Sequence, residues 1–282
     1  MPDNAARLLA NAPVVFVLAA IRFEPLESLP NWMADIQEGL RDHMPLYRRI
    51  RQIISSQGFE LAIDPPDFDA NQPASSWVMS SADGQTSIQV SKSALIVHTR
   101  RYSSFSEFSG LVQIALSGLL KHAKRIHVSQ VGIRYIDHLR VIDGVGVDKF
   151  VPSQLLPHVP DIEGLVLKNA TSTKSYSHGE HLLNVRFNTG AGMSVIPDDL
   201  MAVFLSSTKP GPGGIINFQT LSQDEGVLDT DCLAADLAAQ VMDEQSILSL
   251  LDQLHVTANQ YFRAVTTSEA TDAWHGANAE AT

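Results

Sequence analysis

Two periods of apolar residues run along the chain, and they separate predicted strands from predicted helices. An apolar run from Val14 to Phe23 is rich in β-branched residues and alternates in its second half, which predicts a strand. Apolar residues at three- and four-residue spacing predict a helix over 28–44. Together the elements predicted for the first half are a strand at 14–23, a helix at 28–44, an extended segment at 46–63, strands at 77–81, 86–90 and 94–101, a helix opened by Ser104 and Glu107 and ending near Lys124, and a strand at 127–139.

The second half has weaker patterns, apart from one long helix. An apolar stripe continues over five turns of the segment 244–264, and its face is wide enough to cover a sheet. The other elements predicted are a hairpin of 165–176 and 181–187, strands at 201–206, 215–220 and 227–231, and a short last helix capped by Thr266 and Glu269 that carries Trp274.

This order of elements predicts an α+β fold with a largely antiparallel sheet, because hairpins link the strands and the helices come in separate packets. The region 141–160 has Gly and Pro but no strong period, and is expected to connect two sequential halves. We therefore expect an N-terminal half at 1–145 and a C-terminal half at 146–282, each with a sheet packed against helices.

Charge and cysteine content narrow the function classes. The 282 residues include 20 Lys and Arg against 31 Asp and Glu, a net charge of −11. This balance disfavours a protein that coats nucleic acid, although a local basic groove stays open. The single cysteine, Cys232, excludes an internal disulfide and a Cys-cluster zinc site, so a cytoplasmic setting is expected. The apolar run 12–21 is too short to span a membrane, and no membrane association is expected.

A set of basic residues is expected to share one face of the sheet, if their three strands are neighbours. Arg and His side chains on one face suit phosphate, carboxylate or single-stranded nucleic acid, and His98 or His138 would then serve as general base. The alternative is that this face packs against the second half or another subunit, with Arg22 paired to Glu24 or Asp137. The members of this basic stripe are Arg22, His98, Arg100, Arg134, His138 and Arg140.

Other candidates carry weaker signals. His178 and His181 have a spacing that metal ligands use, but Gly179 interrupts them, so an exposed turn is favoured and no metal is expected. The Gly-rich loop 208–214 with Lys209 offers a phosphate cradle, or else a plain surface loop. Three further groups are favoured as structural: the acidic residues Asp229 and Asp231 as solvated charges, Cys232 as a buried thiol, and His255 as a helix-surface residue. No cofactor is expected.

Several stretches together resemble one sporadically distributed family of bacterial proteins without assigned catalytic residues, so no site residue is carried over from it. The stretches are 11–13 with 21–25, 80–90, 102–108 (YSSFSEF), 131–137 (VGIRYID), and the closing segment from Leu254 through Trp274. The resemblance implies a mobile-element, defence or toxin–antitoxin locus. We therefore expect a non-enzymatic protein that binds a protein partner or itself as a homodimer. The alternatives are a nucleic-acid-processing or nucleotide-binding enzyme that uses the basic stripe, and a homo-oligomeric scaffold.

Overall fold

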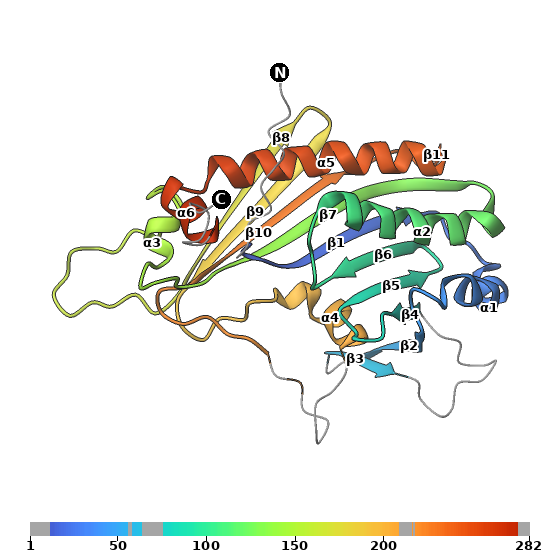
Figure 1. The fold of residues 1–282 in the computed structure, drawn as a ribbon, viewed down its shortest axis with the longest axis horizontal. Helices are drawn as coiled ribbons and strands as arrows, with labels where there is room; N and C mark the ends of the chain where they lie inside the picture. The colour runs from blue at the N-terminus through green and yellow to red at the C-terminus, as the bar shows by residue number, and fades with distance from the viewer. Residues whose placement is uncertain (1–11, 56–57, 64–75, 209–215, 217, 276–282) are drawn as a thin grey trace, which may run out of the picture.

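The longest strand, β7 (Ile126–Leu139), lies inside the sheet and pairs with strands from both halves of the sequence. In the computed structural model, which describes residues 12–55, 58–63, 76–208, 216 and 218–275, eleven antiparallel strands form one sheet (Figure 1). Their spatial order is β3 (Gly58–Ile63), β2 (Leu46–Ser55), β4 (Ser76–Ser80), β5 (Thr86–Ser91), β6 (Ala94–Thr99), β1 (Val14–Phe23), β7, β10 (Gly226–Ala234), β9 (His181–Thr189) and β8 (Ala170–His178), while β11 (Gln240–Met242) pairs with the start of β7.

Helices cover one face of this sheet, and the segment 195–204 covers part of the other face. The long α5 lies against β7, α2 lies against β6, and the two helices pack against each other, above the sheet in Figure 1. The helical elements are α1 (Leu29–Leu40), α2 (Phe105–Ala123), α3 (Val147–Phe150), η1 (Asp198–Leu200), α4 (Met201–Ser207), α5 (Glu244–Ala264) and α6 (Ser268–His275). The α+β class predicted from the sequence is confirmed.

Side-chain caps fix where the two long helices begin. The Ser104 hydroxyl accepts a hydrogen bond from the backbone N–H of Glu107 and opens α2, as predicted. The Asp243 carboxylate does the same for α5 by accepting from the N–H of Ser246 at 2.8 Å. The cap of α6 is Thr267 rather than the predicted Thr266, because the Thr267 hydroxyl accepts from the N–H of Ala270 at 3.1 Å.

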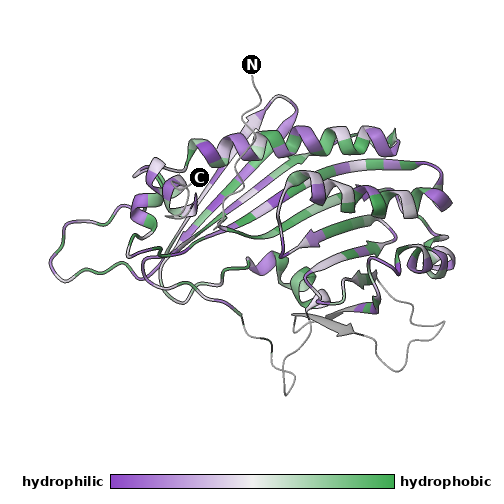
Figure 2. Ribbon diagram, viewed as in Figure 1, coloured by the Kyte–Doolittle hydropathy of each residue, from purple (hydrophilic) through white to green (hydrophobic). Residues whose placement is uncertain are grey.

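Alternation along the strands divides the interior into two apolar layers. In Figure 2 hydrophilic and hydrophobic residues alternate along several strands of the sheet. The larger layer lies under the helices, where β7 contributes Val131 and Ile133 against α5 residues such as Leu251 and Leu254. The smaller layer lies on the opposite face and consists of Phe16, Leu18, Ile136, Val195, Ile196, Leu200, Leu221 and Val227.

Three expectations differ from the structure. The two halves contribute strands to one shared sheet instead of one sheet each, because β10 pairs along most of β7. Residues 201–206 form helix α4 and not a strand, since a short apolar run fits either element until its packing is known. Within 215–220, the described residues show no strand, and Thr220 makes one isolated bridge to Ser194.

Within the described ranges, none of the helices has both the length and the apolar character that crossing a bilayer would require.

Candidate functional site

The structure places part of the basic stripe on one face of the sheet, as the sequence predicted. Strands β6, β1 and β7 are neighbours, and Leu18 of β1 lies in register with both His98 and Arg134. Residues directly opposite each other on adjacent strands point to the same face. His98 and Arg134 therefore belong to one row across the sheet.

This face is covered by the second half of the chain, which was the alternative expectation. Apolar residues of the segment 195–204, which reaches into α4, pack on Phe16 and Leu18. The Arg134 guanidinium makes two hydrogen bonds to Asp229, at 2.7 and 2.8 Å, and two to Asp199, at 2.6 and 3.2 Å. These bonds use most of the N–H donors of the guanidinium group. Arg134 therefore has few donors left to bind an anionic ligand.

The acidic residues of this face serve the same network. The hydrogen bond from Arg134 lowers the pKa of Asp199. Asp229 is 3% exposed and is the main partner of Arg134, so it is not the solvated charge that the sequence suggested. Asp231 lies on the same face, and burial raises its pKa to about 6. Arg186 completes the cluster at 3.5 Å from Asp199.

The two histidines of the stripe are neutral and enclosed. His98 is fully buried and stacks on Phe16 with ring centroids 5.1 Å apart. Burial, followed by the charge of Arg100, lowers the pKa of His98 to about 3. Burial also lowers the pKa of His138, whose ring contacts Glu225 at 3.3 Å and accepts a hydrogen bond from Arg140 at 3.1 Å. Neither ring is placed to act as a general base on a bound substrate.

The remaining candidates of the stripe do not gather at one place. Arg22 is exposed and lies opposite Ala94, at the far end of β6 from His98. Arg100 donates to the carbonyl of Gly84 and lies 5.0 Å above the Phe204 ring. Lys209, with most of the loop 208–214, lies outside the described residues. Asp137 belongs to the opposite face, so it is not the partner of Arg22.

The weak metal candidates lie in a hairpin turn. His178 and His181 face each other where β8 meets β9, and His178 Nδ1 contacts the Thr257 hydroxyl at 3.2 Å. Across the described ranges, no three His, Cys, Asp or Glu residues are arranged to hold a metal ion. Cys232 is buried in β10, and burial raises its pKa to about 12, which fits a structural thiol.

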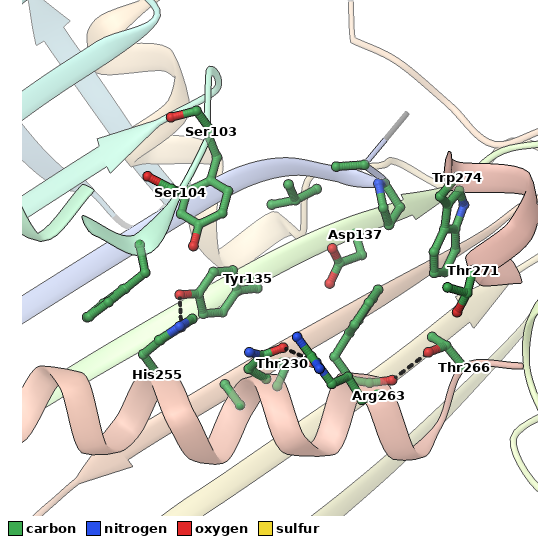
Figure 3. Close-up of a pocket in the computed structure, with 18 of the residues that line it drawn as sticks. Ser103, Ser104, Tyr135, Asp137, Thr230, His255, Arg263, Thr266, Thr271 and Trp274 are labelled. Carbon is green, nitrogen blue, oxygen red and sulfur yellow. Dashed lines mark hydrogen bonds between the residues drawn. The ribbon is translucent and has the colours of Figure 1, made fainter. Parts of the chain in front are cut away.

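A large pocket lies on the other face of the sheet, between the strands and α5. Its volume is about 1030 Å³. The strands β1, β7 and β10 form its floor, α5 and α6 form its walls, and the loop before α2 closes one side (Figure 3). Its aromatic lining residues are Tyr102, Phe105, Tyr135, Phe262 and Trp274. A concave, mainly apolar site with a few polar groups is typical of small-molecule binding.

Asp137 is the most unusual residue of this pocket. It lies on β7 between Val14 and Leu228 of the neighbouring strands, and it is 5% exposed. No hydrogen bond or ion pair joins its side chain to another described residue. In Figure 3 its carboxyl group points toward α5, into the space that the lining residues surround. Burial, and to a lesser extent the charge of Asp229, raises the pKa of Asp137 to about 8.

A tyrosine–histidine pair stands beside this carboxyl group. The Tyr135 hydroxyl lies 2.8 Å from His255 Nδ1, and the His255 ring stacks on Phe105 with centroids 4.0 Å apart. Burial lowers the pKa of His255 and raises that of Tyr135 well above its ordinary value. Both groups are thus neutral near pH 7, and Tyr135 keeps the proton that it can donate to the ring.

Two further polar groups complete the lining. The Thr230 hydroxyl, on β10, is buried without a hydrogen-bond partner among the described residues. Arg263 of α5 is exposed at the wall, where its Nε donates to the Asn259 side chain at 3.2 Å. The pocket thus combines aromatic walls with a carboxyl group and a hydroxyl group that have no partner in the described part of the chain.

No protein-family model matches the chain, and the search of curated proteins finds no significant match, so the family resemblance stays a prediction.

The sequence holds a signal for this pocket that lies outside the basic stripe. Asp137 occupies the apolar phase of β7, in alternation with Ile133, Tyr135 and Leu139. A carboxylate at such a position is either paired inside the protein or available to a ligand. His255 has a similar signal, since it lies four residues after the buried Leu251 and three before the buried Ala258.

Proposed function

We propose that the protein is a binding protein that holds a small organic molecule in the pocket between β7 and α5. The observation that carries the proposal is the aromatic cavity with the buried Asp137 at its floor, which pairs with none of the described residues. Buried polar groups without partners cost stability, so their persistence in a pocket fits a ligand that pairs with them. The basic stripe does not support a nucleic-acid or nucleotide site, because Arg134 is engaged and His98 is enclosed.

Filling the pocket from α5 tests this proposal. Asn259→Trp places an indole in the cavity from a half-buried position whose hydrogen-bond partner is the exposed Arg263. Gln260→Trp is the matched control, since Gln260 is the next residue, exposed and outside the lining. Saturation-transfer NMR with 4-phenylbutanol as probe is expected to show binding to the wild type and to Gln260→Trp, and loss of binding in Asn259→Trp. Absence of binding in all three, or equal binding in all three, would contradict the proposal.

The sequence also led us to expect a protein that binds a protein partner or itself. One observation supports this, and it lies in the connector between α3 and β8. Four apolar side chains there are between 45% and 63% exposed: Val159, Ile162, Leu165 and Val166. Exposed apolar residues that cluster in sequence are common at protein interfaces. As a second candidate function, we propose that this connector joins two copies of the chain. Light scattering is expected to give a dimer for the wild type and a monomer for the double variant Ile162→Asp, Val166→Asp; a monomeric wild type would refute it.

A further inference from the structure

We propose that the ligand of this pocket is an organic amine, an alkylammonium group carried on an apolar or aromatic body, and that Asp137 binds the ammonium. This inference rests on the proposed function, because it assigns a ligand class to the same pocket. The inference follows from the aromatic side chains around Asp137 and from the absence of a cationic partner among the described residues.

Asp137 has no cationic partner among the residues that the structure describes. The residue is buried, yet no Lys, Arg or His of the described residues lies within ion-pair distance of its carboxyl group. Arg134, three residues earlier on β7, points to the opposite face and is held by Asp229. A buried carboxylate is stabilised mainly by an opposite charge or by several hydrogen bonds. A ligand cation would supply the charge that the described residues do not.

The described titratable groups that line the pocket place no positive charge at its floor. From β7 and the loop before α2 come Tyr135 and Tyr102, and burial raises the pKa of each hydroxyl. From α5 comes His255, which burial keeps neutral. The basic residues of the lining lie on the helices: Arg263 of α5, which is exposed and donates to Asn259, and His275 at the end of α6. Asp229, on the opposite face, adds negative potential at Asp137.

The aromatic walls suit a cation with an apolar body. The rings of Tyr102 and Tyr135 meet nearly at right angles, with centroids 5.8 Å apart, and the Asp137 charge acts on both hydroxyls. Phe262 and Trp274 stack with centroids 5.5 Å apart on the side of α6. Ring faces attract ammonium groups, and their area accommodates the apolar part of the ligand. An anionic ligand would instead meet the Asp137 charge, with no cation among the described residues of the floor.

The pH dependence of binding distinguishes an amine from a neutral hydrogen-bonding ligand. An ammonium binds the ionised carboxylate, so its affinity rises with pH while Asp137 loses its proton and levels off above the carboxyl pKa of about 8. A neutral ligand that accepts a hydrogen bond needs the protonated carboxyl, and its affinity falls over the same range. Below the pKa, the amine affinity is expected to change by up to about tenfold per pH unit.

The experiment compares two probes of the same shape on the full-length protein. Dissociation constants for 4-phenylbutylamine and 4-phenylbutanol are measured by NMR titration at pH 6, 7, 8 and 9 in buffers without amines. We expect the amine to bind at least about tenfold more tightly than the alcohol at pH 9, a difference set by the added ion pair. We also expect the amine affinity to rise between pH 6 and pH 8 while the alcohol affinity does not.

Two variants separate Asp137 from the general negative charge of the protein. Asp137→Asn keeps the shape of the side chain and is expected to remove the preference for the amine while alcohol binding continues. Asp252→Asn removes a charge from the exposed face of α5, outside the lining, and is expected to keep the preference. Equal binding of the two probes to the wild type, or a preference that survives Asp137→Asn, would overturn the inference and leave the proposed function standing. Failure of both probes to bind would overturn both.

Discussion

Replacing Asp137 by Asn is expected to stabilise the ligand-free protein. The increase in the free energy of unfolding over wild type should grow with pH. The pKa of this carboxyl is about 8 in the folded chain, against 3.8 as the ordinary value. The folded state therefore holds the proton that the unfolded state releases, and the wild type loses stability as pH rises from about 4 to about 8. The free energy of unfolding falls by about 1.4 kcal/mol for each pH unit in this range. The wild type is therefore less stable at pH 8 than at pH 5 by about 4 kcal/mol. Above pH 8 both states are ionised and the cost is constant.

Urea unfolding at pH 5, 6, 7, 8 and 9 measures this effect. The amide introduced by Asp137→Asn adds its own desolvation cost, but that cost does not depend on pH. The pH dependence of the stability difference between variant and wild type therefore reports only the ionisation of the Asp137 carboxyl. The buffers must contain no amine, which would bind the site under test. We expect the stability difference between Asp137→Asn and wild type to widen from pH 5 to pH 8 and then level off. A difference that stays constant over this range would refute the reasoning, because the carboxyl would then titrate like an exposed one.

Three further predictions concern the parts of the fold that position the site. Arg134→Ala leaves Asp229 buried without its partner and is expected to lower the free energy of unfolding by about 3–5 kcal/mol in urea titrations. His98 has a folded pKa of about 3, below the 6.5 of the unfolded chain, so the wild type loses stability as pH falls below 6.5. His98→Leu should match the wild type at pH 8, where both ring nitrogens lack partners, and exceed it at pH 5 by about 2 kcal/mol in thermal unfolding. Ser104→Ala removes the cap of α2 and should cost about 1 kcal/mol by the same urea assay; no loss would show that the cap contributes little.

The local elements of this fold follow from the sequence, whereas the joining of the two halves does not. Alternation predicted β1 and β7, and the apolar stripe predicted α5 with its bounds at 244–264. The pairing of β7 with β10 joins residues about 90 to 100 positions apart, and no local pattern encodes such a partner. The segment Met201–Ser207 packs as α4 over the Phe16 face, and its short apolar run gave no indication of which element it would form.

The sequence predicted part of the basic stripe but not the pocket that is the candidate site. The sequence predicted that His98 and Arg134 share a face, and strand alternation was sufficient for that. It did not predict that Asp229 lies beside Arg134, because this depends on the register of β10 against β7. The pocket depends on how α5 and α6 lie across the sheet, and this is why Asp137 and His255 acquire their roles only in three dimensions.

The most direct test of the account is the titration of Asp137 itself, followed by the carboxyl carbon resonance in NMR with and without 4-phenylbutylamine. We predict a midpoint near pH 8 for the free protein and a lower midpoint when the amine is bound, because the ammonium stabilises the ionised form. The Asn259→Trp variant, with the cavity filled, should show no response to the amine. A midpoint near pH 4 in the free protein, unchanged by the amine, would contradict the claim that Asp137 is a buried carboxyl group at the floor of a ligand site.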